Sequence, residues 1–327
     1  MNIQWIEKIA SDGKHNAFTT MTYFKGRYFI AFRRGGKHAD DQGTQVVMIS
    51  DNGRQWNILH EKRELIKVEP GQATDYRDSA FLTLEDELRI YSFSMPFDRS
   101  GERLTRALQS TVQISRDGLA WSEPEVISQG IVQWKPIFWK GEFWCAGYHK
   151  EPHPNPSVVE LYHSVDGLAW VSKGRIAVGN ETALVPTGEG FRAFVRTKLA
   201  PGHMEIWECG LDLSSWKRMA VIPKAIQAPQ VQFIAGTCYL IGRDLEPEPR
   251  NSALRRTKIW KIEGTEAVEV LELPSCGDTS YAGTALTPDG SLLVSYYSQH
   301  EINDPNPSED NPISKPADLF VASIAYP

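Results

Sequence analysis

The chain has 327 residues, 41% of them hydrophobic and 23% charged, which are ordinary values for a globular protein. A net charge of −6 without any basic run argues against nucleic acid and against an anionic membrane surface as partners. No window approaches a membrane span, and residues 1–10 lack the apolar stretch of a signal peptide, so we expect a cytoplasmic protein, with export by a trimmed signal as the alternative.

Short β-hairpins recur along the chain, each with two apolar-rich runs around a turn of Gly, Asp or Pro. In chain order they span residues 17–32, 78–91, 136–147, 181–196, 230–243 and 283–296. Their starts lie roughly 45–60 residues apart, the spacing of propeller blades. The repeat predicts an all-β fold without long helices: one six-bladed β-propeller domain of four-stranded antiparallel blades, residues 1–327. We expect residues 1–10 to close the ring against the last blade.

A second repeat lies outside the hairpins. Residues 115–121 and 164–170 share the pattern S-x-D-G-x-x-W, residues 50–56 have Asn for the Asp, and residues 213–216 retain a worn copy. In such a turn the Asp or Asn oxygen accepts backbone N–H bonds, Gly takes the left-handed conformation and Trp packs back over the hairpin. The pattern resembles the Asp-box of sialidases. The resemblance implies a structural turn between the outer two strands of a blade, with Trp56, Trp121 and Trp170 far from any ligand.

Blade geometry brings the start of each inner strand and the end of its neighbour together near the axis. The starts are His15/Asn16, Arg77/Asp78, Trp134/Lys135, Glu181, Pro229/Gln230 and Tyr281, and the ends are Arg33/Arg34, Ser94, His149, Arg196, Arg243 and Tyr297. Charged groups near a closed axis are costly unless they are paired or used. This set, rich in Arg, carboxylate and Tyr, therefore predicts a functional site.

Stretches over nearly the whole chain resemble the sialidase superfamily, and most closely a group of largely uncharacterised bacterial sialidase-like proteins. Residues 280–283, which contain Tyr281, resemble the strand that bears the sialidase nucleophile. Glu181 and Arg196 resemble the glutamate that activates this tyrosine and a substrate-binding arginine. Residues 242–244, which contain Arg243, resemble the strand that ends in another arginine of the triad.

The resemblance extends to the first two blades. Residues 33–36, followed by Asp40 and Asp41, resemble the loop that supplies the acid/base aspartate, and residues 76–78 resemble a strand start whose aspartate lines the pocket. The chain departs from the family at 15–18, where His-Asn-Ala-Phe stands in place of the sialidase Arg-Ile-Pro motif. Because the first arginine of the triad is missing, we predict weak or no activity on simple α-sialosides and better activity on a different, acidic terminal sugar.

Tyr281 is the predicted nucleophile. A phenol has a pKa near 10 and needs a neighbouring base, so we expect Glu181 to accept its proton at about 2.6–3.2 Å while Arg196 and Arg243 stabilise the phenolate. A Tyr nucleophile is a known exception among retaining glycosidases. The alternative is a core tyrosine satisfied by one hydrogen bond.

Asp41 or Asp40 is the predicted general acid, because both lie on a loop that follows an inner hairpin. The sequence does not choose between them, and a solvated loop acid is the alternative. Arg77 and Asp78 are expected to bind sugar hydroxyls or to pair with each other.

Arg34, Arg196 and Arg243 are predicted to form a guanidinium cluster around the substrate, with Lys135 beside Trp134 as a further cation. Salt bridges that close the blades are the alternative. The cluster would make the mouth cationic and favour an anionic or densely hydroxylated sugar. Neither the histidines nor the four cysteines have metal-ligand spacing, so no metal and no cofactor are expected.

These observations predict a sialidase-like exo-glycoside hydrolase that removes a terminal sugar with retention, through a Tyr281 intermediate. Two alternatives stay open: a non-catalytic carbohydrate-binding propeller, and a lyase or inverting glycosidase on the same scaffold. The expected partner is a carbohydrate, and the sequence does not predict an oligomeric state.

Overall fold

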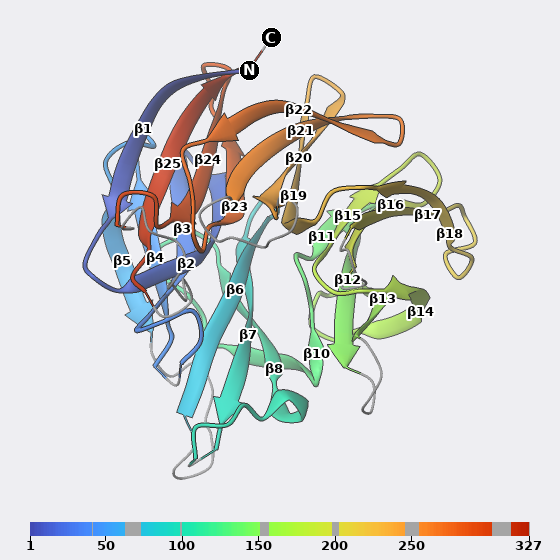
Figure 1. Ribbon diagram of the computed structural model, residues 1–327. Coiled ribbons are helices and arrows are strands. Elements are labelled where there is room, and N and C mark those ends of the chain that lie inside the picture. The colour runs from blue at the N-terminus through green and yellow to red at the C-terminus, as the bar shows by residue number, and fades with distance from the viewer. Residues whose placement is uncertain are drawn as a thin grey trace.

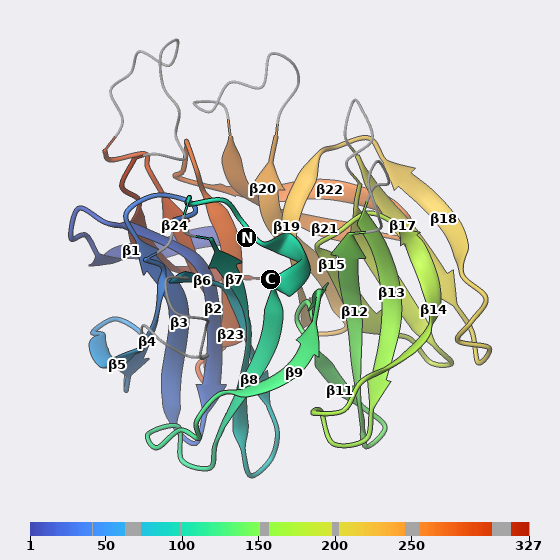
Figure 2. The ribbon, with the colours of Figure 1, turned by 90° about the horizontal axis from the view of Figure 1, so that it is seen from below.

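The computed structural model describes residues 1–40, 42–62, 73–98, 100–150, 157–197, 203–245, 255–302 and 315–326. Six antiparallel sheets stand side by side around a ring, as Figure 1 shows, and Figure 2 shows them at right angles to that view. Within these ranges the only helix is one 3-10 turn, Thr105–Ala107, so no described helix is long and apolar enough to cross a membrane. The predicted six-bladed propeller is confirmed.

The first two blades each contain four strands that follow one another from the axis outwards. They are β2 (His15–Phe24), β3 (Arg27–Gly35), β4 (Thr44–Ser50) and β5 (Asn57–Lys62), then β6 (Ala73–Thr83), β7 (Leu88–Phe97), β8 (Gln109–Ser115) and β9 (Glu125–Gln129). The fourth and fifth blades are built in the same way. They are β15 (Thr182–Pro186), β16 (Phe191–Arg196), β17 (Met204–Cys209) and β18 (Lys217–Ile222), then β19 (Ile226–Ile234), β20 (Thr237–Asp244), β21 (Arg256–Glu263) and β22 (Glu266–Leu273).

The third blade differs because its inner strand is broken. Both β10 (Ile131–Val132) and β11 (Ile137–Trp139) pair with β12 (Glu142–Lys150), and β13 (Ser157–Ser164) and β14 (Val171–Val178) complete the sheet. The break contains Lys135 at φ 44° and Pro136. Proline has no N–H to donate to the ladder, which explains why pairing stops there.

The last blade joins the two ends of the chain. Its inner strands are β23 (Ser280–Leu286), β24 (Ser291–Ser298) and β25 (Asp318–Ala325), and its outermost strand is β1 (Asn2–Ala10). Ile6 lies opposite Ala322 in the antiparallel pairing of β1 with β25. The predicted closure is confirmed, and it covers an edge that would otherwise expose unpaired backbone groups.

The S-x-D/N-G-x-x-W turns at residues 50–56, 115–121 and 164–170, called the motif turns below, connect the third and fourth strands of their blades, as expected. In the second blade, Asp117 Oδ1 accepts the backbone N–H groups of Leu119 at 2.8 Å and Ala120 at 2.9 Å, and the Trp121 indole donates to the Gly118 carbonyl at 3.1 Å. Asn52 and Asp166 accept equivalent pairs of N–H bonds. The indole nitrogen of Trp170 departs from this pattern, because it is buried without a hydrogen-bond partner among the residues that the structure describes.

These turns also hold neighbouring blades together. Gly118 has φ 77°, and a Cβ placed on it would lie 2.4 Å from the Phe29 ring of the preceding blade. Gly53 meets Leu293 and Gly167 meets Tyr91 in the same manner. The glycine is therefore required both for its left-handed backbone and for the close approach of the next blade.

The hydrophobic core lies between the faces of adjacent blades. One cluster packs Trp144 and Leu161 of the third blade against Phe191 of the fourth, and another packs Phe194 of the fourth against Trp260 of the fifth. Each such buried side chain contributes about 1.5–3 kcal/mol. This packing fixes the orientation of the inner strands and thereby positions the groups at the axis.

Candidate active site

Five of the six inner segments carry a non-glycine residue in the left-handed conformation. With φ between 44° and 60°, they are Phe18, Asp78, Lys135, Ala228 and Tyr281. In four strands the residue lies within a shift of the pairing register. In the fourth blade, Glu181 directly precedes β15. Each such conformation costs about 1–3 kcal/mol, and strain of this kind is concentrated at functional sites.

The Tyr281 hydroxyl donates a hydrogen bond to Glu181 Oε1 at 2.8 Å, within the predicted range. Glu181 also forms an ion pair with Arg196, and its Oε2 accepts the N–H of Ala228 at 2.9 Å. Burial opposes ionisation of Glu181, but Arg196 and the Tyr281 hydroxyl bring its pKa below the usual value. Burial, and then the charge of Glu181, raises the pKa of Tyr281 well above 10. The resting pair therefore holds its proton on the phenol, with an ionised base beside it.

Aromatic rings and Arg243 surround the phenol. The Tyr281 ring lies 4.8 Å from Phe18 and 6.1 Å from Trp134, both edge to face, and Arg243 lies 5.7 Å from its centroid. Arg243 donates to Gln227 Oε1 at 2.6 and 3.1 Å and to Asp278 Oδ1 at 2.7 Å. Arg243 thus lies beside Tyr281 as predicted, but most of its donors are already used by the protein.

Asp278 is the centre of a buried polar network. Its Oδ1 accepts from Arg243 and from the Tyr297 hydroxyl at 3.0 Å, while its Oδ2 lies 3.0 Å from His15 Nε2 and 2.5 Å from His38 Nδ1. Burial opposes ionisation, but the imidazoles and Arg243 bring the pKa of Asp278 well below its usual range.

His15, His38 and Asp278 could also supply three metal ligands, because their donor atoms lie within 4.8 Å of one another. Hydrogen bonds already account for most of these atoms. His38 Nε2 lies 3.4 Å from Arg77 Nη2, which can only donate, so its Nδ1 carries the proton that faces Asp278. Burial lowers the pKa of His38 to about 4, in keeping with a neutral ring.

Asp40 is buried in the loop that follows β3. Its two oxygens accept from Arg33 Nη2 at 2.9 Å and from the backbone N–H groups of Gly36, Lys37 and Gln42 at 2.5, 3.0 and 3.0 Å. Every one of these neighbours is a donor, so Asp40 acts as an acceptor that shapes the loop. Asp41, the other predicted acid, lies outside the described residues.

Arg77 and Asp78 do not pair with each other. Arg77 donates to Asp75 Oδ2 at 3.2 Å and to the His38 carbonyl at 3.1 Å. Asp78 forms no hydrogen bond or ion pair with any residue that the structure describes, and its Oδ1 is buried. Burial raises the pKa of Asp78 to about 7, and the charges of Glu181 and Asp75 add to the effect.

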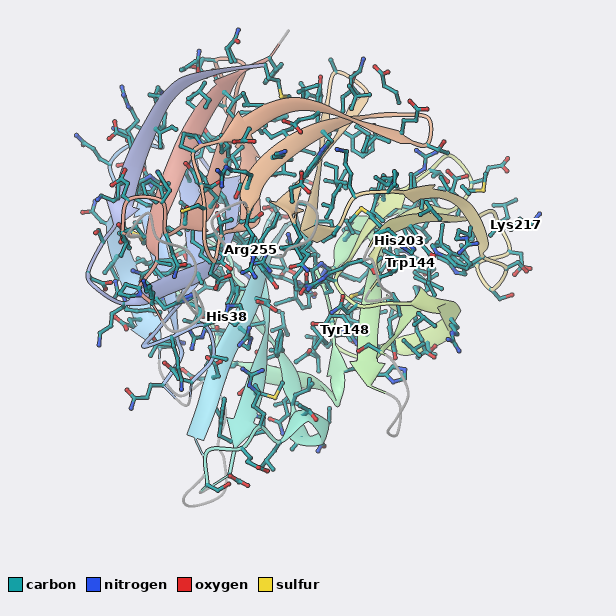
Figure 3. All side chains as sticks on the ribbon, viewed as in Figure 1. His38, Trp144, Tyr148, His203, Lys217 and Arg255 are labelled. Carbon is teal, nitrogen blue, oxygen red and sulfur yellow. The ribbon has the colours of Figure 1, made fainter. Side chains whose placement is uncertain are left out.

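Lys135 and Tyr148 lie close to the same carboxyl groups. Burial lowers the pKa of Lys135 to about 8, although Asp78 and Glu181 oppose that shift. The Lys135 ammonium donates to Gln230 Oε1 at 2.8 Å and lines a cavity of about 1010 Å³ that extends to the turn at 84–87. Burial, followed by Asp78 and Glu181, raises the pKa of Tyr148, which Figure 3 shows towards the middle of the ring, whereas Lys217 lies at its rim.

Arg34 does not join the other predicted arginines in the described network. It pairs with Asp12 at 3.0 Å and Glu61 at 2.8 Å, whereas its neighbour Arg33 is buried and forms an ion pair with Asp75. Arg34 is therefore not part of the predicted guanidinium cluster, whereas Arg196 and Arg243 both lie near Tyr281. Near Tyr281, three arginines pair with internal carboxylates: Arg77 with Asp75, Arg196 with Glu181 and Arg243 with Asp278.

Several residues of the site were not singled out from the sequence: Arg33 as distinct from Arg34, His38, Asp75, Tyr148 and Asp278. Tyr148 precedes His149, which the hairpin pattern predicts at the axis, but His149 instead lies 3.9 Å from Glu160. Successive strand residues point to opposite faces, so a predicted strand end that is wrong by one position selects the outward residue, here His149, in place of the inward residue, here Tyr148.

Neither a sequence model of a known family nor the sequence of a curated protein matches the chain. Solved structures do match. A Dyadobacter fermentans DSM 18053 protein of unknown function superposes with a TM-score of 0.75 at 19% identity, covering 100% of this chain and 99% of that one.

Two further structures are of sialidases. Trypanosoma rangeli sialidase in complex with sialic acid matches with a TM-score of 0.71 at 13% identity over 98% of this chain and 57% of its own, so the chain spans little more than half of that protein. Phage phi92 endosialidase matches with a TM-score of 0.68 at 10% identity over 98% and 69%. The fold is therefore that of the sialidase propellers.

Proposed function

We propose that the protein is a retaining exo-glycoside hydrolase with Tyr281 as its nucleophile. The observation that carries the proposal is the 2.8 Å hydrogen bond from the Tyr281 hydroxyl to Glu181, a carboxylate held in place by Arg196 and the Ala228 N–H. A phenol needs such a base, and the strained backbone at φ 47° that presents Tyr281 supports a functional role. The sialidase-like fold agrees with this chemistry.

In the first step, Tyr281 Oη bonds to the anomeric carbon as the glycosidic C–O bond breaks, and the phenol proton passes to Glu181. A general acid protonates the departing oxygen. In the second step, water attacks the same carbon and gives a proton to the conjugate base of the general acid, the bond to Tyr281 breaks, and the phenolate recovers its proton from Glu181. Arg196 and Arg243 lower the energy of the transient phenolate because both lie close to it.

We further propose that the sugar is densely hydroxylated and lacks a carboxylate at the anomeric carbon. The donors of Arg243 are taken by Asp278 and Gln227, and Arg77 and Arg196 also pair with internal carboxylates. A substrate carboxylate would have to displace an internal one from a buried site, which is costly. Simple α-sialosides should therefore be poor substrates.

A panel of aryl glycosides with neutral sugars, uronic acids and sialic acid tests the proposal. We expect hydrolysis of at least one member, first release of the sugar in its original anomeric configuration by NMR, and a Tyr281-containing peptide labelled by the matching fluorinated glycoside. Sugar binding without turnover would favour the non-catalytic propeller. Inverted or unsaturated products would favour the other two reaction types.

A further inference from the structure

One carboxyl group at the axis is unlike all the others. Glu181, Asp75, Asp278 and Asp40 each accept at least one hydrogen bond from an arginine or form an ion pair with one. Asp78 has no such partner among the described residues, and its buried Oδ1 accepts nothing. A carboxylate with a buried, unpaired oxygen destabilises a fold, so the presence of Asp78 at this place calls for a functional reason.

The backbone at Asp78 has the same unusual conformation as the backbone at Tyr281. Asp78 has φ 48° in the register shift of β6, and Tyr281 has φ 47° in that of β23. Phe18 of the first blade lies between these two blades and packs on Tyr281. The phenol and the Asp78 carboxyl thus approach the axis from blades separated by one other, with an aromatic side chain between them.

The groups that face Asp78 favour a carboxyl that can hold a proton. Burial, Glu181 and Asp75 raise its pKa, Arg77 and Lys135 lower it, and the outcome is a pKa of about 7. Tyr148 and Tyr281 also lie close enough for Asp78 to raise their pKa values. A group that is partly protonated near neutral pH can both give and take a proton. Asp40 cannot do this, because four donors hold it as an acceptor.

We propose that Asp78 is the general acid and base of the glycosidase reaction proposed above, on which this inference rests. Protonated Asp78 gives its proton to the departing aglycone oxygen while Tyr281 bonds to the anomeric carbon. The resulting Asp78 carboxylate then takes a proton from the water that attacks this carbon, and the sugar leaves Tyr281 with the hydroxyl. Both groups end the cycle in their starting protonation states.

The decisive experiment compares aryl glycosides whose leaving phenols have pKa values from about 4 to 10. Asp78→Asn should lower kcat/KM by about 10²–10⁴-fold for the least acidic phenol and by less than about tenfold for the most acidic, which leaves without help. Azide, which needs no base, should restore turnover of the activated substrate and yield a glycosyl azide. Asn tolerates the left-handed backbone, so the variant is expected to fold.

Asp40→Asn is the matched control, and its loss should be the same for every leaving phenol. A uniform loss in Asp78→Asn would overturn the inference, and so would a graded loss confined to Asp40→Asn. If the parent hydrolyses its substrate with retention and Tyr281 is labelled, such results reject the role of Asp78 alone. If Tyr281 is not labelled, the proposed function itself fails.

A measurement without substrate gives an independent check. Titration of the parent with 13C-labelled aspartate carboxyl groups should show one resonance with a pKa near 7 that is missing in Asp78→Asn. An Asp78 resonance that titrates near 4 would reject the proposal, whatever substrate the enzyme accepts. The kcat/KM of the parent should fall as pH rises through about 7, and this alkaline limb should disappear in the variant.

Discussion

Replacing Tyr281 with Phe separates chemistry from stability at the proposed nucleophile. The change removes the hydroxyl that donates to Glu181 at 2.8 Å, but the ring keeps its packing on Phe18 and Trp134. A hydrogen bond to a charged group contributes about 1.5–3 kcal/mol, and Glu181 retains Arg196 and the Ala228 N–H. We therefore expect the free energy of unfolding to fall by no more than about 3 kcal/mol.

Turnover should fall far more than stability. Loss of the nucleophile should lower kcat by at least about 10³-fold on any glycoside that the parent hydrolyses. The assay is release of the aryl group, with unfolding in urea followed by tryptophan fluorescence. Tyr296→Phe is the control. The Tyr296 hydroxyl donates to the Pro274 carbonyl at 3.2 Å and lies on the face of β24 opposite to Tyr297, so its removal should leave turnover unchanged. Hydrolysis by Tyr281→Phe at the parental rate would show that the tyrosine is structural.

Three further predictions concern substrate charge, the motif turns and pH. An aryl α-sialoside should be cleaved far less efficiently than the best neutral aryl glycoside, and efficient cleavage would mean that Arg243 is not blocked by Asp278. Gly118→Ala should lower the free energy of unfolding by about 2–4 kcal/mol, because the added Cβ strains the backbone and contacts Phe29. Gly236→Ala, whose added Cβ would have no atom within 4 Å, should lower it by only about 1 kcal/mol. Equal losses of the two variants in urea unfolding would contradict the role of the turn in joining blades. Asp78→Asn should raise the free energy of unfolding relative to the parent, and this gain should grow by about 2–3 kcal/mol between pH 5 and pH 8. The reason is that the raised pKa of Asp78 makes its ionised form costly in the folded state only. A gain that is the same at pH 5 and pH 8 would contradict that pKa.

The sequence by itself determined the propeller, because the information is local and repeated. A hairpin needs only two apolar runs and a turn residue. A motif turn needs an Asp or Asn that lies two and three residues before the N–H groups it binds, as Asp117 shows. Six such hairpins also define where each inner strand begins, and that is sufficient to place Tyr281 and Glu181 at the axis. Their contact across 100 positions of sequence follows from ring closure.

The tertiary structure decided which charged groups are available at the axis. Arg33 and Arg34 are adjacent on one strand, so they point to opposite faces, and only the packed blades show that Arg33 is the buried one. The partner of His15 is Asp278, 263 positions away in the segment between β22 and β23. Asp40 and Asp78 have the same side chain, but four donors surround the first and none reaches the second among the described residues. Protonation and availability depend on neighbours that other blades supply, and no local pattern encodes them.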